Sequence, residues 1–405
     1  MRATSRAGGM EKLIAVGLAI AVAGGLGAAW RVQAPSQHDL EAKAQEAPVL
    51  TRIQSAVASS PSFIADMVAA RNAKGDDVRF LFGTSELEYV CDDTAHPTRF
   101  FNEHDYGFSL MCVGNAGCQS LWQAMELAAL EEEGAVSGNR IALMLGTQWF
   151  MEDGLTESAF AKRFSEETFA TVMANPRLSD ATKQKIYDRC VAMGADPQQL
   201  DELKDPSLVS SINRAISDLP ASVERSEAIM DDVDEQGRPF EEIAADKADA
   251  ITDWEELNEL VVEEGKRSCT NNDLGIYDEY YTDIFVPQDK ENREKDEPQC
   301  TEWSEKEFGD FEIFLDVCQD LGIKPLVVLQ PAKGVYYDNT PYDKESREIF
   351  YNKIRGMIDE ADAELLDLTP YEYDMYYLRD VMHPEWKSWV IVNQKLCELY
   401  GDSND

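Results

Sequence analysis

Short apolar runs alternate with stretches of helical periodicity along much of the chain. The runs are nearly all apolar, a pattern that favours strands buried on both faces over strands with one solvent face. Helical stretches such as 118–132 and 344–361 fit between most of the runs, an order typical of a parallel sheet covered by helices. The five predicted strands are Val78–Phe82, Ser109–Val113, Ile141–Leu145, Pro325–Leu329 and, more weakly, Glu364–Leu368.

The chain between the third and fourth predicted strands has a different pattern. From Thr156 to Glu264 no run predicts a strand, and Ser179 has the position and side chain of a helix N-cap. We therefore predict a helical, acidic insertion at about residues 155–310, within an α/β domain that spans 51–400. Its helical periodicity is carried by Phe160, Phe164, Phe169 and Val172.

The N-terminus has a basic flank followed by the uncharged run Leu13–Trp30. At 1.5 Å per residue this run spans roughly 27 Å, close to the thickness of a bilayer core. We expect residues 1–31 to form a cytoplasmic stub and membrane anchor, residues 32–50 a polar stalk, and the remainder to lie outside the cytoplasm. The alternatives are a cleaved signal peptide, which leads to the same compartment, and a buried soluble helix, which the basic flank disfavours.

All eight cysteines follow this apolar run, and none forms a CxxC pair, which argues against a zinc ribbon. An even number of cysteines outside the cytoplasm favours disulfides. Cys269 and Cys300 lie on either side of an acidic, irregular stretch and are the predicted pair. The alternative is that several cysteines are buried small hydrophobic side chains.

The charge of the chain narrows its range of partners. With 37 Lys+Arg against 77 Asp+Glu the net charge is −40. Binding to phosphates requires basic side chains, so nucleic acid and anionic lipid surfaces are disfavoured partners. Acidic stretches such as 231–235 are interpreted as a solvated face, with a partner surface as the alternative. Neither GxGxxG nor GxxxxGK[ST] occurs and no metal-ligand spacing is visible, so we expect no cofactor.

Polar side chains and glycines follow the predicted strands directly. Since parallel strands present their carboxyl ends at one edge, where ligands bind, we expect these residues to meet at that rim. Ser85 follows the first strand, Gly117 and Gln119 the second, Gln148 the third, Gln330 and Lys333 the fourth, and Asp380 and His383 come after the fifth.

Only four histidines occur, and His383 has Asp380 three residues before it. A serine hydroxyl becomes a nucleophile when a base takes its proton and a third group orients that base. We therefore expect Ser85 to be a nucleophile, His383 its base and Asp380 the orienting group. The backbone N–H groups of Ser85 and Gly117 are candidates for an oxyanion hole. Gln119 and Gln148 complete the predicted substrate-binding residues.

Each of these features also has a structural interpretation. Thr84 or Ser85 could cap the helix that follows, and an Asp-x-x-His sequence commonly serves capping or surface roles. Trp386 and Trp389 are interpreted as residues that pack the last helix on the sheet. The argument for chemistry rests on the joint arrangement at one rim.

Five sequence blocks run in order from about residue 78 to 390. They are Phe82–Leu87 with His96-Pro97; Gly114–Ser120; Gln148-Trp149-Phe150 with Gly154-Leu155; Pro331, Gly334, Tyr337 and Asp338; and Tyr376-Tyr377 with Asp380, His383, Trp386 and Trp389. This set resembles the motifs of the DltD family, the membrane-anchored factor of teichoic acid D-alanylation, which is related to the SGNH hydrolases. Pro384-Glu385, Gly146-Thr147 and Lys333 depart from the family's motifs, and the last stands where an asparagine is common.

The resemblance implies an SGNH-hydrolase-like, flavodoxin-like α/β domain: a three-layer parallel sheet of about five strands with a helical insertion and an N-terminal transmembrane helix. It places this domain outside the cytoplasm at the cell membrane. By position, Ser85, His383 and Asp380 would serve acyl transfer. The implied partners are a DltB-like membrane O-acyltransferase, a D-alanyl donor, and teichoic acid or a similar cell-envelope polymer.

Three functions follow as hypotheses. The first is an acyltransferase that moves D-alanine onto such a polymer through Ser85. The second is an esterase or thioesterase of the same class, with water as the acceptor. The third is a non-catalytic scaffold that docks a membrane O-acyltransferase.

Overall fold

The computed structural model describes residues 37–46, 52–53, 57, 59–88, 93–204, 224, 226–231, 233, 247–295 and 297–401. The predicted anchor, Leu13–Trp30, lies outside these residues, as does most of the acidic stretch 231–235. No helix in the described part of the chain combines the length and the apolar character needed to cross a bilayer.

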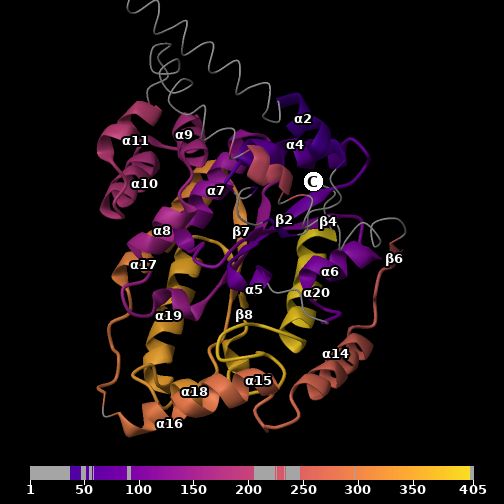
Figure 1. Ribbon diagram of the computed structural model, residues 1–405, viewed down its shortest axis with the longest axis vertical. Helices are drawn as coiled ribbons and strands as arrows, with labels where there is room; N and C mark the ends of the chain where they lie inside the picture. Colours follow the sequence, from indigo (N-terminus) through magenta and orange to yellow (C-terminus); the bar gives the residue numbers. More distant parts are fainter. Residues whose placement is uncertain are drawn as a thin grey trace, which may run out of the picture.

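The centre of the domain is a parallel sheet with the strand order β1-β4-β2-β5-β7-β8 (Figure 1). All five predicted strands are confirmed, with ends that differ by one residue. The short strand β1 is an addition that pairs with β4. The strands are β1 (Arg52–Ile53), β2 (Val78–Gly83), β4 (Ser109–Gly114), β5 (Arg140–Leu145), β7 (Lys324–Leu329) and β8 (Glu364–Asp367).

The order of the five longer strands is the flavodoxin-like order. Counted along the chain from β2, the strands lie as 2-1-3-4-5 across the sheet. The chain turns from β2 to one side to form β4 and then returns to the other side to form β5. This reversal creates a switch point between β2 and β5, and ligands bind outside the carboxyl ends of the strands at such points.

Two hydrophobic cores cover the two faces of the sheet. Phe80 and Phe82 of β2 belong to one core, whereas Leu81 belongs to the other, because successive side chains of a strand point to opposite faces. The first core is closed by α4 (Pro61–Asn72), α7 (Ser120–Glu132), α17 (Glu305–Leu321) and α19 (Lys344–Glu360). The second is closed by α5 (Ser85–Glu88), α6 (Pro97–Glu103), α14 (Trp254–Ser268) and α20 (Lys387–Gly401). The result is the predicted three-layer arrangement.

The chain between β5 and β7 is largely helical, as predicted. The periodic phenylalanines fall on two helices, α8 (Glu157–Arg163) and α9 (Glu166–Ala174), because Phe164 ends the first and Ser165 caps the second. Ser179 is confirmed as the N-cap of α10 (Asp180–Ala192), since its hydroxyl accepts the N–H of Thr182. The expectation of no strand in this region is wrong at one point: β6 (Ala248–Asp249) pairs with β3 (His104–Asp105). So short a strand leaves no apolar run to recognise.

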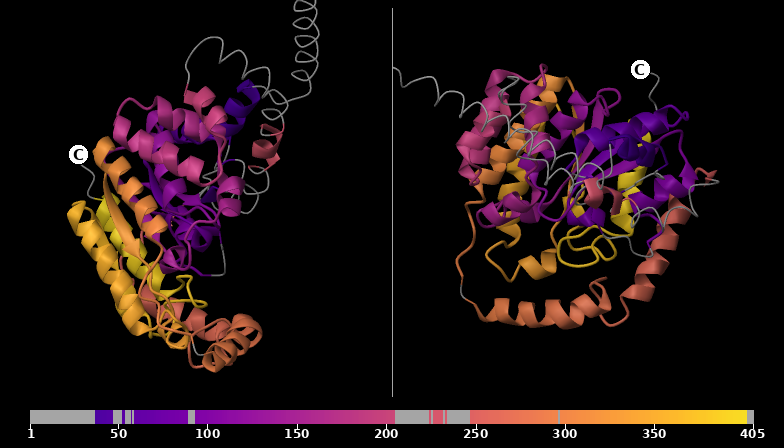
Figure 2. Two further views of the ribbon diagram at one scale, coloured as in Figure 1. Left: turned by 90° about the vertical axis from the view of Figure 1, so that its left-hand side faces the viewer. Right: turned by 45° about the horizontal axis from the view of Figure 1, so that its top comes forward.

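Several of the remaining helices lie at one end of the domain. Figures 1 and 2 show the segment from α14 to α16 running along one end, next to the loop that precedes α20. The remaining elements are α2 (Gln37–Glu46), α11 (Pro197–Lys204), α15 (Asp278–Tyr280), α16 (Val286–Glu294) and α18 (Gly334–Tyr337), the 3-10 helices η1 (Thr147–Phe150) and η3 (Thr369–Tyr371), and the π-helical turn η2 (Tyr281–Phe285).

The predicted disulfide between Cys269 and Cys300 is wrong, because both residues are free thiols. Cys269 belongs to the core on one face of the sheet, whereas Cys300 packs against the core on the other face. The N–H of Cys300 donates to Pro341 O at 2.7 Å, which ties it to the segment just before α19. Burial raises the pKa of Cys269 to about 12, so this thiol is neutral. The alternative interpretation, a buried small hydrophobic side chain, describes Cys269.

Candidate functional site

Ser85 begins the short helix α5 directly after β2, at the rim next to the switch point. The preceding residue is held by Glu86, whose carboxylate accepts the Thr84 N–H at 2.8 Å and the Thr84 hydroxyl at 2.6 Å. Glu86 thus fixes the strand-to-helix turn without using the Ser85 side chain. The Ser85 hydroxyl makes its hydrogen bond elsewhere, with a residue far along the chain.

Ser85, His383 and Asp380 form one hydrogen-bonded chain. Ser85 Oγ lies 2.9 Å from His383 Nε2, although the two residues are 298 positions apart. His383 Nδ1 lies 2.7 Å from Asp380 Oδ2. The other carboxylate oxygen, Asp380 Oδ1, accepts the N–H groups of Met382 and His383, each at 2.8 Å. The three side chains that the sequence analysis grouped therefore lie together, in the order Ser85, His383 and Asp380.

The protonation state of Asp380 determines the tautomer of the histidine. Burial acts to raise the pKa of Asp380. The hydrogen bond from His383 and the charge of Arg379 outweigh burial, and the pKa of Asp380 is held below its ordinary value. An ionised Asp380 is only an acceptor, so neutral His383 keeps its proton on Nδ1. Its Nε2 lone pair is then free to accept the Ser85 proton.

The loop at residues 372–386, which carries Asp380 and His383, is attached by buried hydrogen bonds to the segment before α6 and to α20. Asp93 Oδ2 accepts the Trp386 N–H at 2.9 Å, and the Ser388 hydroxyl donates to Tyr377 O at 2.6 Å. Burial raises the pKa of Asp93 to about 6. Trp386 and Trp389 are buried in the core beneath this loop, which confirms their interpretation as packing residues.

His96 has a structural role that the sequence analysis did not identify. It is fully buried, with Nδ1 2.7 Å from the Thr98 hydroxyl and Nε2 3.1 Å from Glu86 O. Its ring also meets the edge of Trp389, with centroids 5.1 Å apart. His96 therefore joins the Ser85 turn to α6 and α20. The His-Pro pair at a helix start was the available signal, since Pro is favoured in the first turn.

The turn after β4 starts beside the turn after β2, because Gly114 pairs in register with Gly83. A Cβ atom on Gly114 would lie 1.9 Å from Gly83 O, and its φ is +153°, so only glycine fits. The amide of Gln123 donates to Gly83 O and, at 2.8 Å, to Cys118 O, which joins the two turns. Gly117 has φ +83° in this second turn.

Two helices of the region between β5 and β7 hold this second turn in place. Arg163 Nε of α8 donates to Ala116 O at 3.0 Å. Glu307 of α17 is fully buried and accepts the N–H of Ser120 at 3.1 Å. Burial and the neighbouring Asp310 carboxyl raise the pKa of Glu307 above its ordinary value. No sequence spacing indicated these contacts, because each joins residues far apart in the chain.

Gln119 and Gln148 lie on the predicted rim, but they are not hydrogen-bonded to the three side chains within the described residues. Gln119 Oε1 is buried and has no hydrogen-bond partner there. The amide of Gln148 lies against its own turn, because a Cβ on Gly146 would be 2.7 Å from Gln148 Nε2. Their substrate-binding roles, and that of Gly117, stay predictions.

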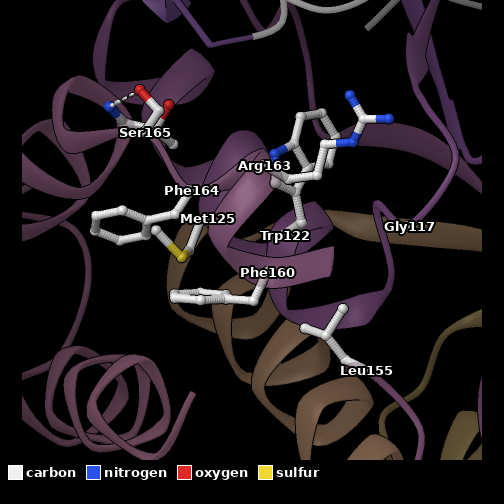
Figure 3. A pocket seen from close by; sticks show the side chains of 9 residues that line it. Gly117, Trp122, Met125, Leu155, Phe160, Arg163, Phe164 and Ser165 are labelled. Carbon is white, nitrogen blue, oxygen red and sulfur yellow. Dashed lines mark hydrogen bonds between the residues drawn. The ribbon is translucent and has the colours of Figure 1, made fainter. Parts of the chain in front are cut away.

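A small apolar hollow lies next to Gly117 (Figure 3). Trp122, Phe160 and Phe164 contribute much of its lining. Its volume of about 10 Å³ admits roughly one water molecule. This hollow is therefore too small to receive an acyl chain.

A much larger cleft opens on the side of Asp380. We call it the Asp380 cleft; its volume is about 610 Å³. Four carboxylates and one guanidinium line it, so its charge is negative. The lining residues are Ser268, Tyr277, Asp278, Glu279, Tyr280, Asp283, Ile284, Arg379 and Asp380.

Comparison with known proteins places the chain within a family. The profile of the family described as "DltD protein" matches residues 56–400. "Protein DltD" of Bacillus subtilis (strain 168) is 28% identical over 358 residues, which cover 86% of this chain and 88% of the relative. "Protein DltD" of Staphylococcus aureus (strain NCTC 8325 / PS 47) is 27% identical over 330 residues, 78% and 80% of the two chains. That of Lacticaseibacillus rhamnosus is 22% identical over 366 residues, 84% and 82%. The chain belongs to the DltD family.

Proposed function

We propose that this protein is an acyltransferase that takes a D-alanyl group onto Ser85 and passes it to a hydroxyl of teichoic acid or a related envelope polymer. Membership of the DltD family supports involvement in teichoic acid D-alanylation. The observation that carries the mechanism is the 2.9 Å contact between Ser85 Oγ and His383 Nε2, with Asp380 on the far side of the imidazole.

The reaction proceeds in two steps, acylation of Ser85 and transfer of the acyl group to the acceptor. Ser85 Oγ attacks the acyl carbonyl while its proton passes to His383 Nε2, and the leaving group then takes that proton. The result is an alanyl ester on Ser85. In the second step His383 removes the proton of the acceptor hydroxyl, whose oxygen attacks the ester. His383 Nε2 then gives this proton to Ser85 Oγ as the ester bond to Ser85 breaks, which restores the free serine. Asp380 stays ionised and stabilises the imidazolium in both steps.

The N–H groups of Ser85 and Gly117 are the proposed oxyanion hole. Their turns begin at neighbouring strand ends, with Gly83 opposite Gly114. Glycine at position 117 permits the positive φ of this turn and a close approach of the substrate. Backbone donors fixed before the reaction stabilise the developing oxyanion more effectively than water can.

The proposed fold relationship is to the SGNH hydrolases. A serine after the first long strand of a flavodoxin-like sheet, and an Asp-x-x-His before the last helix, support it. We further propose that the domain works outside the cytoplasm, held at the membrane by the predicted helix at 13–30. There it would act with a DltB-like membrane O-acyltransferase as the source of the acyl group.

The Asp380 cleft is the proposed site for the alanyl group. A D-alanyl ester carries a free ammonium, and a cleft with excess carboxylates attracts a cation. Glu279 and Asp283 are exposed in this cleft and belong to the insertion. They are therefore proposed to act on the amino group of the substrate and to leave the acyl chemistry unaffected.

Replacing both cleft carboxylates, Glu279→Gln with Asp283→Asn, is expected to raise KM for a D-alanyl ester about fivefold and to leave kcat unchanged, since an exposed charge pair contributes up to about 1 kcal/mol. The measurement compares hydrolysis or transfer of a D-alanyl ester with that of an uncharged propionyl ester. The control is Glu294→Gln on α16, which does not line the cleft. An equal change for both esters contradicts ammonium recognition.

Ser85→Ala is the cellular test of the proposed function. In a strain that lacks the protein, the variant is expected to restore none of the polymer-linked D-alanine. Alanine has no hydroxyl oxygen with which to form the ester to the acyl group. Ser158→Ala, an exposed serine on α8, serves as the control and should restore the wild-type amount. Full restoration by Ser85→Ala would instead favour the scaffold.

The same three side chains could deliver the acyl group to water. In that case the purified protein would release free D-alanine from a D-alanyl donor when no polymer is present. Release at a rate equal to transfer identifies an esterase, whereas release only as a slow background supports the acyltransferase.

A further inference from the structure

Lys333 is a lysine buried at the rim of the sheet. It follows β7, precedes α18 and is 1% exposed. A lysine is rarely buried without hydrogen-bond partners, because removing an ammonium from water costs several kcal/mol. Lys333 Nζ has two such partners, Leu274 O at 2.6 Å and Asp374 O at 3.0 Å.

These two carbonyl groups belong to segments far apart in the sequence. Leu274 lies between α14 and α15, in the region between β5 and β7. Asp374 lies in the 372–386 loop, which carries Asp380 and His383. The backbone N–H of Lys333 donates to Val381 O at 2.9 Å, between Asp380 and His383. One residue thus holds the loop at two points and joins it to a second segment.

The two segments also contact each other directly. The N–H of Tyr277 donates to Arg379 O at 2.9 Å, next to Asp380. A Cβ on Gly275 would lie 2.8 Å from Tyr376 N, and the φ of Gly275 is +65°. The segment at 274–277 therefore lies against the loop closely enough to limit its movement.

We propose that Lys333 is a positioning residue for the acyl transfer, which holds the 372–386 loop against the 274–277 segment and so fixes Asp380 and His383 opposite Ser85. This inference rests on the proposed function, because positioning matters only if the three side chains react. It also assigns a role to the region between β5 and β7. The 274–277 segment of this region supports the loop that carries His383.

The pKa of Lys333 reflects the burial of its side chain. Burial lowers the pKa of Lys333 to about 8, and the negative charge of Asp374 acts against this lowering. The Cys269 thiol is neutral, since burial raises its own pKa to about 12. Removing the ammonium relieves the free-energy cost of burying a charge. It also takes the lysine donor away from Leu274 O and Asp374 O. These two effects on the free energy of unfolding oppose each other.

Lys333→Met keeps an unbranched side chain only one heavy atom shorter and removes the hydrogen-bond donors. We expect the rate at which a fluorophosphonate labels Ser85 to fall about 10- to 100-fold, since small displacements of catalytic groups have effects of this size. The maximal rate should fall while the probe concentration at half-maximal rate stays the same. Lys353→Met is the control, because Lys353 is a half-buried lysine on α19 that pairs with Glu305.

Gly275→Ala tests the same contact without altering the lysine, and it keeps the inference testable if Lys333→Met does not fold. The added methyl group should push the segment away from Tyr376 and slow labelling in the same way. Gly194→Ala is its control, because Gly194 also has a positive φ, +92°, but has no atom within 4 Å of a Cβ.

Hydrogen–deuterium exchange on the same proteins measures the contact directly. In Lys333→Met and Gly275→Ala, residues 270–281 and 374–383 should exchange faster, while β2 and β5 stay protected. The inference is overturned if both variants are labelled at the wild-type rate, or if hydrogen exchange in both is the same as in the wild-type protein. If the wild-type protein itself is not labelled, the proposed function fails, and the exchange data alone then decide whether Lys333 holds the loop.

Discussion

Asp380→Asn is expected to lower the rate of Ser85 acylation by about 10³- to 10⁴-fold, as loss of the orienting carboxylate does in serine enzymes. The asparagine can still accept the N–H groups of Met382 and His383 through one oxygen, so the loop should keep its shape. Its amide N–H would point at His383 Nδ1 and force the proton onto Nε2. The imidazole would then be unable to accept the Ser85 proton.

His383→Ala should reduce acylation by a similar factor, because it removes the base itself. The effects of the two changes are not expected to add, since the residues act as one unit. The measurement is stopped-flow or gel-based labelling of the purified protein, with thermal unfolding as a check on the fold. The control is His104→Ala, a histidine in β3 bonded to Phe100 O. A labelling rate within tenfold of wild type for Asp380→Asn would contradict the assigned role.

Gly114→Ala is expected to destabilise the protein by roughly 3 kcal/mol or more, because a new Cβ would overlap Gly83 O at 1.9 Å. Gly83 directly precedes the turn that carries Ser85, so the strand ends must separate to admit the methyl group. The expected result is a lower midpoint of urea unfolding together with loss of Ser85 labelling. Equilibrium unfolding followed by circular dichroism provides the measurement.

Gly134→Ala provides the matched control for this change. Gly134 also has a positive φ, +76°, but a Cβ there meets no atom within 4 Å. Its substitution should cost about 1 kcal/mol, the backbone strain alone. Equal losses of stability for the two variants would show that the close approach of Gly114 to Gly83 has no energetic importance.

The sheet was predictable because its strands are buried on both faces. A run such as Val78–Phe82 must be apolar along its whole length, and this leaves a clear pattern in the sequence. The strands β1 and β6 have two residues each and left no such pattern. The pairing of Cys269 with Cys300 was wrong because cysteine spacing says nothing about the face of the sheet on which each residue lies.

The site was predictable as far as it depends on strand ends. Ser85 and His383 could be grouped because a parallel sheet brings its carboxyl ends together. The residues that support them could not be found in this way. Glu307 and Lys333 act through backbone groups of distant segments, and His96 acts through the carbonyl of Glu86 on a neighbouring turn. Such partners are defined only by the packed structure.

The central claim is that Ser85 is a nucleophile activated by His383. The most direct measurement is reaction of the purified protein with a fluorophosphonate, followed by peptide mapping by mass spectrometry. The account predicts one adduct, on the peptide that contains Ser85, and its loss in both Ser85→Ala and His383→Ala. An unlabelled wild-type protein, or an adduct on another serine that persists in Ser85→Ala, would contradict it.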